Sequence, residues 1–153
     1  MNKTAVFPGS FDPVTIGHVD IVKRALPLFD KLIIGIGSNS EKKYFFSEEK
    51  REAWLKKIFG SENKIEVMHY DGLTVDFCKK ISASYILRGI RTSADFEFER
   101  LIAQMNSQMA PGVETVFILS RPEFSHISST IVRDIIRNKG DVSLFVPDGV
   151  GIL

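Results

Sequence analysis

Short runs of β-forming residues alternate along this chain with longer segments in which apolar residues recur at helical spacing. Two of the short runs, residues 32–34 and 116–119, are continuously apolar, which is typical of strands buried on both faces of a sheet. The pattern predicts five strands, at residues 4–7, 32–36, 65–69, 85–87 and 115–119. It predicts helices at residues 17–28, 47–59, 73–81, 95–109 and 128–138.

The alternation of strands and helices predicts the fold class. Parallel strands joined by right-handed helical crossovers form a doubly wound α/β sheet with helices on both faces. We therefore expect a single domain over residues 1–153 with a five-stranded, Rossmann-like parallel sheet. In such sheets ligands bind outside the carboxyl ends of the strands, so the residues that follow each strand are the first candidates for a site.

Individual side chains mark the ends and faces of these helices. Pro27 must sit near the end of the first helix, because proline cannot continue the helical hydrogen bonds. Ser47 is a cap candidate at the start of the second helix. The helix at 95–109 carries an apolar stripe at helical spacing, made of Phe98, Leu101, Ile102, Met105 and Met109.

Composition and charge narrow the function classes. The 153 residues include 20 basic and 19 acidic side chains, and this net charge of +1 argues against a protein that coats nucleic acid. Cys78 is the only cysteine, so neither an intramolecular disulfide nor a Cys-based zinc site is expected. The sequence shows neither a signal peptide nor an apolar run of about 18 residues, which predicts a soluble, cytoplasmic protein without a membrane partner.

The most informative motif lies near the start of the chain, where a strand and a turn are followed by Thr15-Ile16-Gly17-His18 at a helix start. Backbone N–H groups at a helix start lack partners within the helix and the dipole end is positive, so anions are attracted there. A histidine beside such a site can donate a hydrogen bond to a phosphate oxygen. Taken alone, the motif also fits a glycine needed for packing and a histidine at the surface or in a cap.

Other strand ends carry groups that suit a phosphate. Arg88 and Arg91 flank a glycine after an apolar strand, and guanidinium groups bind phosphates through paired donors. Three hydroxyls at residues 128–130 begin the last helix, where they either cap it or help to hold a phosphate. Lys42 and Lys43 follow the second strand. Each of these features also fits an ordinary solvated turn, cap or charge pair.

A metal centre and a free acid pair are weaker candidates. His18, His69 and His126 lack the spacing of metal ligands, so no zinc site is expected. Asp95 and Glu99 lie four residues apart on a helix, which fits solvated acids.

Together with residues 8–13, 94–99 and 140–147, these motifs resemble one family over nearly the whole chain. Thr15-x-Gly17-His18 is similar to the T/H-x-G-H signature of a nucleotidyltransferase superfamily. The Arg-Gly-x-Arg, Ala-Asp-Phe-Glu and Ile-Ser-Ser-Thr blocks resemble those of the bacterial phosphopantetheine adenylyltransferases. The resemblance implies transfer of the adenylyl group of ATP to 4′-phosphopantetheine, which gives 3′-dephospho-coenzyme A and pyrophosphate in the penultimate step of coenzyme A biosynthesis.

The resemblance also implies which residues act. The expected catalytic residues are Ser10, His18, Lys42 and Arg91, with His18 stabilising charge on the ATP phosphates and no general base required. The expected ATP contacts are Ser10, Phe11, His18, Gly89, Ile90, Arg91, Glu99, Phe124, Ser125, His126, Ile127, Ser128, Ser129 and Thr130. The expected phosphopantetheine contacts are Ser10, Lys42, Thr74 and Arg88.

The family further implies Mg²⁺ bound with ATP and without a dedicated protein site, a homohexamer, and coenzyme A as a feedback ligand. Two departures from its pattern stand out. Position 10 is serine where the family often has threonine, which preserves the hydroxyl. The family usually continues into a final helix beyond the position of Pro147, and we expect that helix to be shortened or absent here, because only residues 148–153 follow. We expect this difference to affect packing or assembly more than chemistry.

Two alternative functions remain open at this point. The first is a related nucleotidyltransferase with another acceptor, such as nicotinamide mononucleotide or glycerol 3-phosphate. The second is a catalytically silent nucleotide-binding module on the same fold. The phosphate-directed groups at several strand ends favour an enzyme, because a sensor has no need of all of them.

Overall fold

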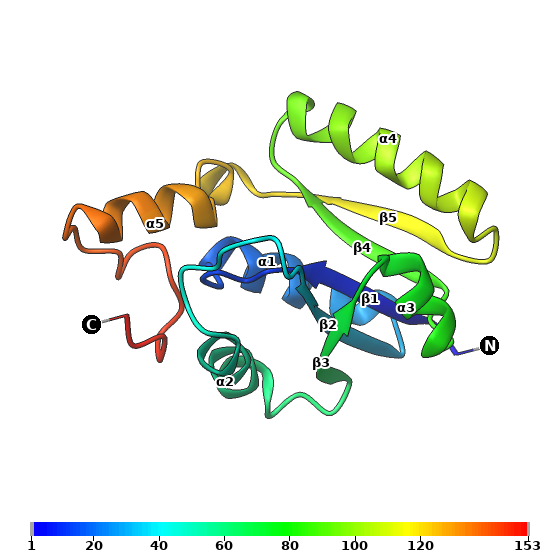
Figure 1. Cartoon of the computed structure of the whole chain (residues 1–153), viewed down its shortest axis with the longest axis horizontal. Helices are drawn as coiled ribbons and strands as arrows, with labels where there is room; N and C mark the ends of the chain where they lie inside the picture. Colours follow the sequence, from blue (N-terminus) through cyan, green and yellow to red (C-terminus); the bar gives the residue numbers. More distant parts are fainter. Residues whose placement is uncertain (1, 153) are drawn as a thin grey trace.

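The computed structural model describes residues 2–152 and contains the expected parallel sheet (Figure 1). Its strands are β1 (Thr4–Gly9), β2 (Lys31–Ser38), β3 (Ile65–Asp71), β4 (Tyr85–Ile90) and β5 (Glu114–Leu119). All neighbouring pairs are parallel, in the order β3-β2-β1-β4-β5. The doubly wound α/β fold is therefore confirmed. The direction of winding reverses between β1 and β4, which is where such sheets form a ligand crevice.

Helices connect these strands and follow the last of them. Within residues 2–152 they are α1 (Ile16–Ala25), α2 (Glu48–Phe59), α3 (Thr74–Lys80), α4 (Ser93–Met109), α5 (Ser129–Arg137) and the 3₁₀ segments η1 (Leu26–Leu28) and η2 (Pro122–Phe124). Thr15, Ser47, Thr92 and Ser128 cap α1, α2, α4 and α5, each accepting a backbone N–H from three residues further on. No helix in this part of the chain combines the length and the apolar character that crossing a membrane requires.

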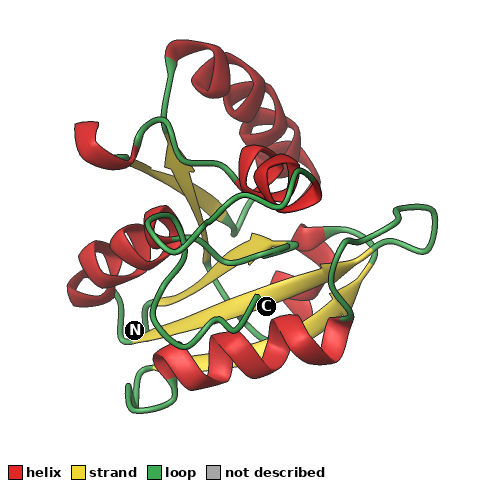
Figure 2. Cartoon of the chain, turned by 90° about the vertical axis from the view of Figure 1, so that its left-hand side faces the viewer, coloured by secondary structure: helices red, strands yellow, loops and turns green. Residues whose placement is uncertain are grey.

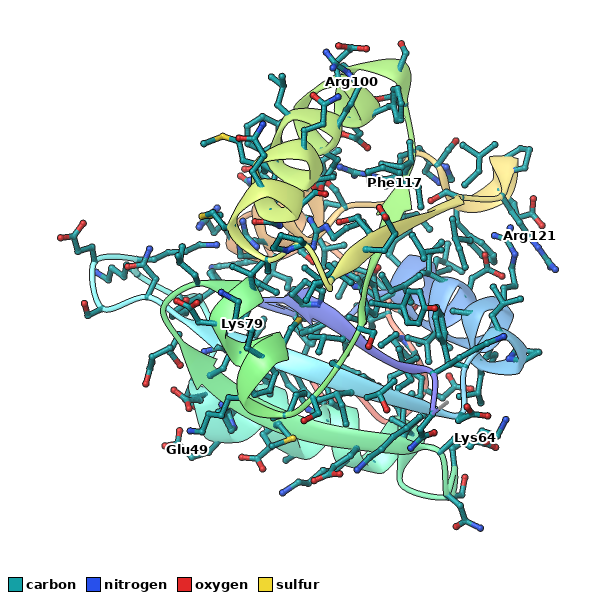
Figure 3. All side chains as sticks on the ribbon, turned by 90° about the vertical axis from the view of Figure 1, so that its right-hand side faces the viewer. Glu49, Lys64, Lys79, Arg100, Phe117 and Arg121 are labelled. Atoms are coloured by element: carbon teal, nitrogen blue, oxygen red, sulfur yellow. The ribbon has the colours of Figure 1, made fainter. Side chains whose placement is uncertain are left out.

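Two apolar cores cover the two faces of the sheet. α1 and α2 bury residues such as Val22 and Leu55 on one face, and α3 buries Cys78 on the other. Figure 3 shows α3, marked by Lys79, in front of the sheet, and α2, marked by Glu49, behind it. Figure 2 likewise shows the strands between helices on both sides. Burial on both faces explains the apolar run at residues 32–34 of β2. The expectation is wrong for residues 116–119, because β5 is an edge strand and none of its residues is buried.

Several element boundaries differ from the expected ones. Residues 8–9 and 88–90 lie inside β1 and β4 instead of following them, because their ladders continue as far as the Gly9–Ile36 and Ile90–Leu119 pairs. The first helix ends at Ala25 and continues only as the 3₁₀ segment η1, since Pro27 removes the N–H that an α-helix needs there.

α4 leaves its apolar stripe exposed to solvent. None of its residues is buried, and Phe98, Leu101 and Met105 are 66%, 52% and 64% exposed. α4 lies along β5 (Figure 1) and contacts it through Phe96, whose ring meets that of Phe117 at 5.8 Å between centroids. Helical spacing thus identified an apolar face, but in the isolated chain this face remains open to solvent.

Candidate active site

His18 lies in the first turn of α1, where it forms a capping box with Thr15. The Thr15 hydroxyl accepts the His18 N–H at 3.4 Å, and His18 Nδ1 accepts the backbone N–H of Thr15 at 3.0 Å. The rings of Phe7 and Phe11 lie 6.1 and 5.1 Å from the imidazole centroid. Because Nδ1 is the acceptor of this bond, the neutral ring carries its proton on Nε2.

The surroundings of His18 keep its ring neutral. Burial away from water, followed by the positive charges of Arg88 and Arg91, lowers the pKa of His18 from 6.5 to about 4. The single lone pair of a neutral imidazole is then taken by the Thr15 N–H. What His18 offers a ligand is therefore the Nε2–H donor alone.

This geometry predicts an unusual titration for His18. We expect its ring nitrogens to keep the signature of the neutral Nε2–H form from pH 8 down to about pH 5, measured by ¹⁵N NMR, because the pKa is about 4. The folded-state pKa lies below the unfolded value, so the folded state should lose stability as the pH falls from about 6.5 toward 4. Protonation of His18 near pH 6.5 would contradict the assignment.

Arg88 projects from β4 and is held in place by three hydrogen bonds. Its Nε and Nη2 donate to the two carboxylate oxygens of Glu99 at 2.9 and 2.6 Å, and Nη1 donates to the Pro8 carbonyl at 2.8 Å. The Glu99 side chain is only 13% exposed. Glu99 is therefore not an ordinary solvated acid, because it fixes the orientation of a guanidinium at the carboxyl end of the sheet.

Arg91 connects the end of β4 with the segment that precedes α5. Its Nε donates to Asp95 at 3.2 Å, and its Nη1 donates to the Ile127 carbonyl at 3.3 Å. These contacts hold the guanidinium near the start of α5, on the same side of the sheet edge as His18. The arginines of the Arg-Gly-x-Arg motif thus have separate partners, and neither is a free surface charge.

The N-terminus of α5 is bound to the β1–α1 loop. Ser129 Oγ donates to the Pro13 carbonyl at 2.7 Å, and Arg133 Nη1 donates to the Asp12 carbonyl at the same distance. Ser128 is the N-cap, so the helix begins one residue later than expected. Part of the hydroxyl cluster therefore serves the structure, and it brings α5 close to the first helix start.

Two cavities of about 380 Å³ each open at this edge of the sheet. We call them the His18 cavity and the Lys42 cavity after a residue that lines each one. The two cavities share a wall, made of Pro8, Gly9, Ser10, Arg88 and Glu99. Ser10 and Arg88 are thus accessible from both cavities.

Most of the sequence-predicted site residues line these cavities. The predicted ATP contacts at the His18 cavity are Ser10, Phe11, His18, Gly89, Arg91, Glu99, Phe124, Ile127, Ser128, Ser129 and Thr130. The predicted phosphopantetheine contacts at the Lys42 cavity are Ser10, Lys42, Thr74 and Arg88. Residues that are 120 positions apart in sequence are thus brought to one edge of the sheet.

Three predicted ATP contacts are not among the cavity-lining residues. Ile90 is buried in the sheet, and its carbonyl accepts the Ser120 N–H at 2.8 Å. Ser125 Oγ donates to the Pro122 carbonyl at 3.0 Å, which closes the turn of η2. His126 has an exposed side chain.

Other residues of the Lys42 cavity were not predicted from the sequence, among them Tyr44, Tyr70 and Asn106. Tyr70 Oη lies 2.9 Å from Thr74 Oγ1, and burial raises the pKa of this phenol. Asn106 follows Glu99 by seven residues, which places both on one face of α4. That spacing could have identified Asn106 from the sequence. Tyr44 and Tyr70 could not be identified in this way, because their positions in the cavity depend on where β2 and β3 end.

Two glycines of the motifs have different reasons to be glycine. A Cβ on Gly89 would come within 3.1 Å of Ile21, so this glycine lets α1 approach β4. A Cβ on Gly17 would meet only Thr15 Oγ1, at an ordinary 3.5 Å. Packing therefore does not require glycine at position 17, and because Gly17 lines the His18 cavity, close approach of a ligand is the better explanation.

Comparison with known proteins shows the family of this chain. The cytidylyltransferase-like family model matches residues 6–135. The phosphopantetheine adenylyltransferase of Flavobacterium psychrophilum is 53% identical over 150 residues, which cover 98% of this chain and 99% of that protein. The chain belongs to the phosphopantetheine adenylyltransferase family. The enzymes of that name from Christiangramia forsetii and Bacteroides thetaiotaomicron are 53% and 46% identical, over 97% and 98% of this chain and 97% and 99% of theirs.

The segment that follows α5 packs against the sheet. Residues 138–152 follow α5 as turns and extended backbone, and no further helix occurs in them. Val142, Val146 and Val150 from this segment are buried in the core that α1 and α2 form on the sheet. The segment is thus part of the apolar core, on the opposite side of the sheet from α3.

Proposed function

We propose that the chain transfers the adenylyl group of ATP to 4′-phosphopantetheine, giving 3′-dephospho-coenzyme A and pyrophosphate. One observation carries the proposal: two cavities of similar size share the wall that bears Ser10 and Arg88. A transfer between two bound phosphates needs such an arrangement, because the attacking and leaving oxygens must lie on opposite sides of the phosphorus. ATP is assigned to the His18 cavity and phosphopantetheine to the Lys42 cavity.

The reaction needs no general base. The nucleophile is a phosphate monoester, whose second pKa is about 6, so it is largely ionised at neutral pH. His18 has no lone pair free to accept a proton, because Nδ1 already accepts the Thr15 N–H. We therefore assign to its Nε2–H a hydrogen bond to an α-phosphate oxygen, where charge increases in the transition state.

Neutralisation of charge and positioning supply the rest of the mechanism. Ser10, Lys42 and Arg88 would hold the acceptor phosphate against the α-phosphate, and Thr74 would contact the pantetheine arm. On the other side Arg91 and the start of α5 would hold the ATP phosphates. Binding two anions side by side is unfavourable in water, and several fixed cations lower that cost.

The fit of a divalent metal can be judged from the carboxylates. In residues 2–152 no three His, Cys, Asp or Glu side chains are grouped so that they could hold a metal ion. The cavity acids Asp95 and Glu99 are paired with Arg91 and Arg88. We therefore propose that Mg²⁺ arrives with ATP as part of the substrate, and we assign no protein ligand to it.

The acceptor can be identified with a coupled assay of pyrophosphate release. With ATP and Mg²⁺ present, we expect turnover with 4′-phosphopantetheine and none above background with nicotinamide mononucleotide or glycerol 3-phosphate. Turnover with another acceptor only would replace the proposed substrate. ATP binding without turnover on any acceptor would instead support a silent nucleotide-binding module.

We also propose a homohexamer, as the family resemblance implies, with α4 in an interface between copies. Phe98, Leu101 and Met105 on α4 and Leu119 at the end of β5 are between 52% and 66% exposed. An exposed apolar face of this kind is typical of a surface that another chain covers.

The assembly can be tested by a charge on this face. Leu101→Glu is expected to shift the light-scattering mass toward smaller species, because a carboxylate would be buried there without a partner. Leu28→Glu is the matched control, since Leu28 is 53% exposed on η1 and away from α4. An unchanged mass for Leu101→Glu would exclude α4 from the interface.

Three further assignments follow from the proposed reaction. We propose that residues 1–153 act as one catalytic domain and that the enzyme works in the cytoplasm, where its two substrates are metabolites. Coenzyme A contains the pantetheine arm of the acceptor, so we propose that it competes for the Lys42 cavity as a feedback ligand.

A further inference from the structure

Arg51 of α2 is a buried guanidinium without an acidic partner among the described residues 2–152. Its side chain is among the largest fully buried ones, in a residue that is 2% exposed. None of the ion pairs formed within residues 2–152 involves it. Burying an unpaired charge is costly, so the groups that Arg51 does contact must account for its presence.

Those groups are backbone carbonyls and one aromatic ring. Arg51 Nη1 donates to the Ser10 carbonyl at 2.7 Å, and Nε donates to the Phe46 carbonyl at 3.1 Å. The guanidinium carbon lies 4.2 Å from the centroid of the Tyr44 ring. One side chain thus connects the β1–α1 loop, where Ser10 lies, with the loop between β2 and α2.

The β2–α2 loop is the segment that carries Lys42. Tyr44 Oη donates to the Gly37 carbonyl at 3.1 Å and accepts the Asn39 N–H at 3.0 Å. Lys42 Nζ lies 5.5 Å from the centroid of the same Tyr44 ring that Arg51 contacts. The Tyr44 ring is thus contacted by both the Arg51 guanidinium and the Lys42 ammonium.

Asp12 supports the same connection from the other direction. Its buried carboxylate accepts the Phe45 and Phe46 N–H groups at 2.7 and 2.8 Å. Asp12 lies two residues beyond Ser10, so the two loops are joined by an acid from one side and by Arg51 from the other. A methionine or leucine at position 51 would fill the space but would leave the Ser10 and Phe46 carbonyls without their donor.

We propose that Arg51 is a positioning residue for adenylyl transfer, which sets the distance between Ser10 and Lys42 without touching either substrate. This inference rests on the proposed function, in which Ser10 and Lys42 hold the acceptor phosphate against ATP. A displacement of about 1 Å in such a pair costs on the order of 100-fold in rate. A guanidinium is suited to the task because its planar donors reach two carbonyls at once.

Arg51→Lys keeps the positive charge but loses the planar set of donors that reaches the Ser10 and Phe46 carbonyls at once. We expect kcat with phosphopantetheine to fall about 100-fold, while the Kd for ATP, titrated in the absence of acceptor, stays close to the wild-type value. Arg137→Lys is the matched control. Arg137 also lies over an aromatic ring, that of Phe45 at 5.2 Å, but it is exposed and forms no hydrogen bond with Ser10. That control should behave as wild type.

A double-mutant cycle separates positioning from general destabilisation. In the Arg51→Lys background, Lys42→Ala should cost at least about tenfold less in kcat than it costs in wild type, since Lys42 is already displaced. Arg91→Ala, on the ATP side, should cost the same in both backgrounds. Additive effects for both pairs would mean a purely structural role and would overturn the proposal.

Two further measurements apply if the Arg51→Lys variant does not fold or if wild type uses another acceptor. If Arg51→Lys does not fold, Tyr44→Leu replaces it in the cycle, because it removes the ring through which Arg51 reaches Lys42, and additivity there overturns the proposal as well. If wild type uses only another acceptor, the proposed function fails and the cycle is run with that acceptor. Inactivity of wild type toward every acceptor overturns both.

Discussion

His18→Ala is expected to lower kcat by about 100- to 1000-fold, the usual effect of removing one donor that stabilises transition-state charge. The affinity for ATP should change little, because Arg91 and the start of α5 remain to hold the phosphates. The loss should appear equally in kcat and in kcat/KM, which is typical of an interaction made only in the transition state. Steady-state kinetics and an independent ATP titration measure the two quantities.

The substitution also removes half of the capping box, so its effect on folding needs a control. Loss of the bond to the Thr15 N–H should cost about 1 kcal/mol in the free energy of unfolding. Ser47→Ala removes the N-cap of α2 at a similar cost and lines neither cavity. We expect Ser47→Ala to unfold at a lower urea concentration with normal turnover. Unchanged turnover in His18→Ala would remove His18 from the mechanism.

Arg88→Lys is expected to be the second large effect, with kcat/KM for phosphopantetheine reduced about 1000-fold through both a higher KM and a lower kcat. Arg88 is the cation on the wall shared by the two cavities, so it contacts both reacting groups in the proposed complex. An ammonium cannot reproduce the paired bonds to Glu99 together with the bond to the Pro8 carbonyl.

The free energy of unfolding distinguishes Arg88→Lys from a variant that loses the positive charge altogether. Lysine can still neutralise Glu99, whereas Arg88→Met leaves that carboxylate 13% exposed and unpaired, at a cost of about 3 kcal/mol. Arg100→Lys is the matched control, because Arg100 pairs with Glu97 on the exposed side of the same helix. If Arg88→Lys kept the wild-type KM and kcat, the shared wall would not be the place where the phosphates meet.

Local patterns were sufficient for the architecture. The strands and helices occur close to where the apolar patterns place them, because β-forming runs and helical spacing are local signals that each segment carries by itself. Their ends were less predictable. Residues 88–90 read as a turn in isolation, but pairing with β5 keeps them in β4, and their partners in β5 lie 29 residues further along the chain.

Contacts between residues that are distant in sequence could not be predicted from local patterns. Glu99 fits a solvated acid in sequence, and only the packing of α4 beside β4 makes it the bidentate partner of Arg88. The same holds for Arg51, whose hydrogen bond to the Ser10 carbonyl depends on the packing of α2 against the β1–α1 loop. Such pairs depend on interhelical and helix–sheet geometry, which has no period in the sequence.

The sequence alone determined the sheet, the family resemblance and the helix start at Thr15-x-Gly17-His18, since each of these depends on neighbours within a few residues. Only the tertiary structure decided what His18 can do. The Thr15 N–H occupies Nδ1, burial and two arginines keep the ring neutral, and the wall at Ser10 and Arg88 joins two cavities into one site. These properties arise from groups that are distant along the chain and meet only when the carboxyl ends of β1 and β4 lie side by side.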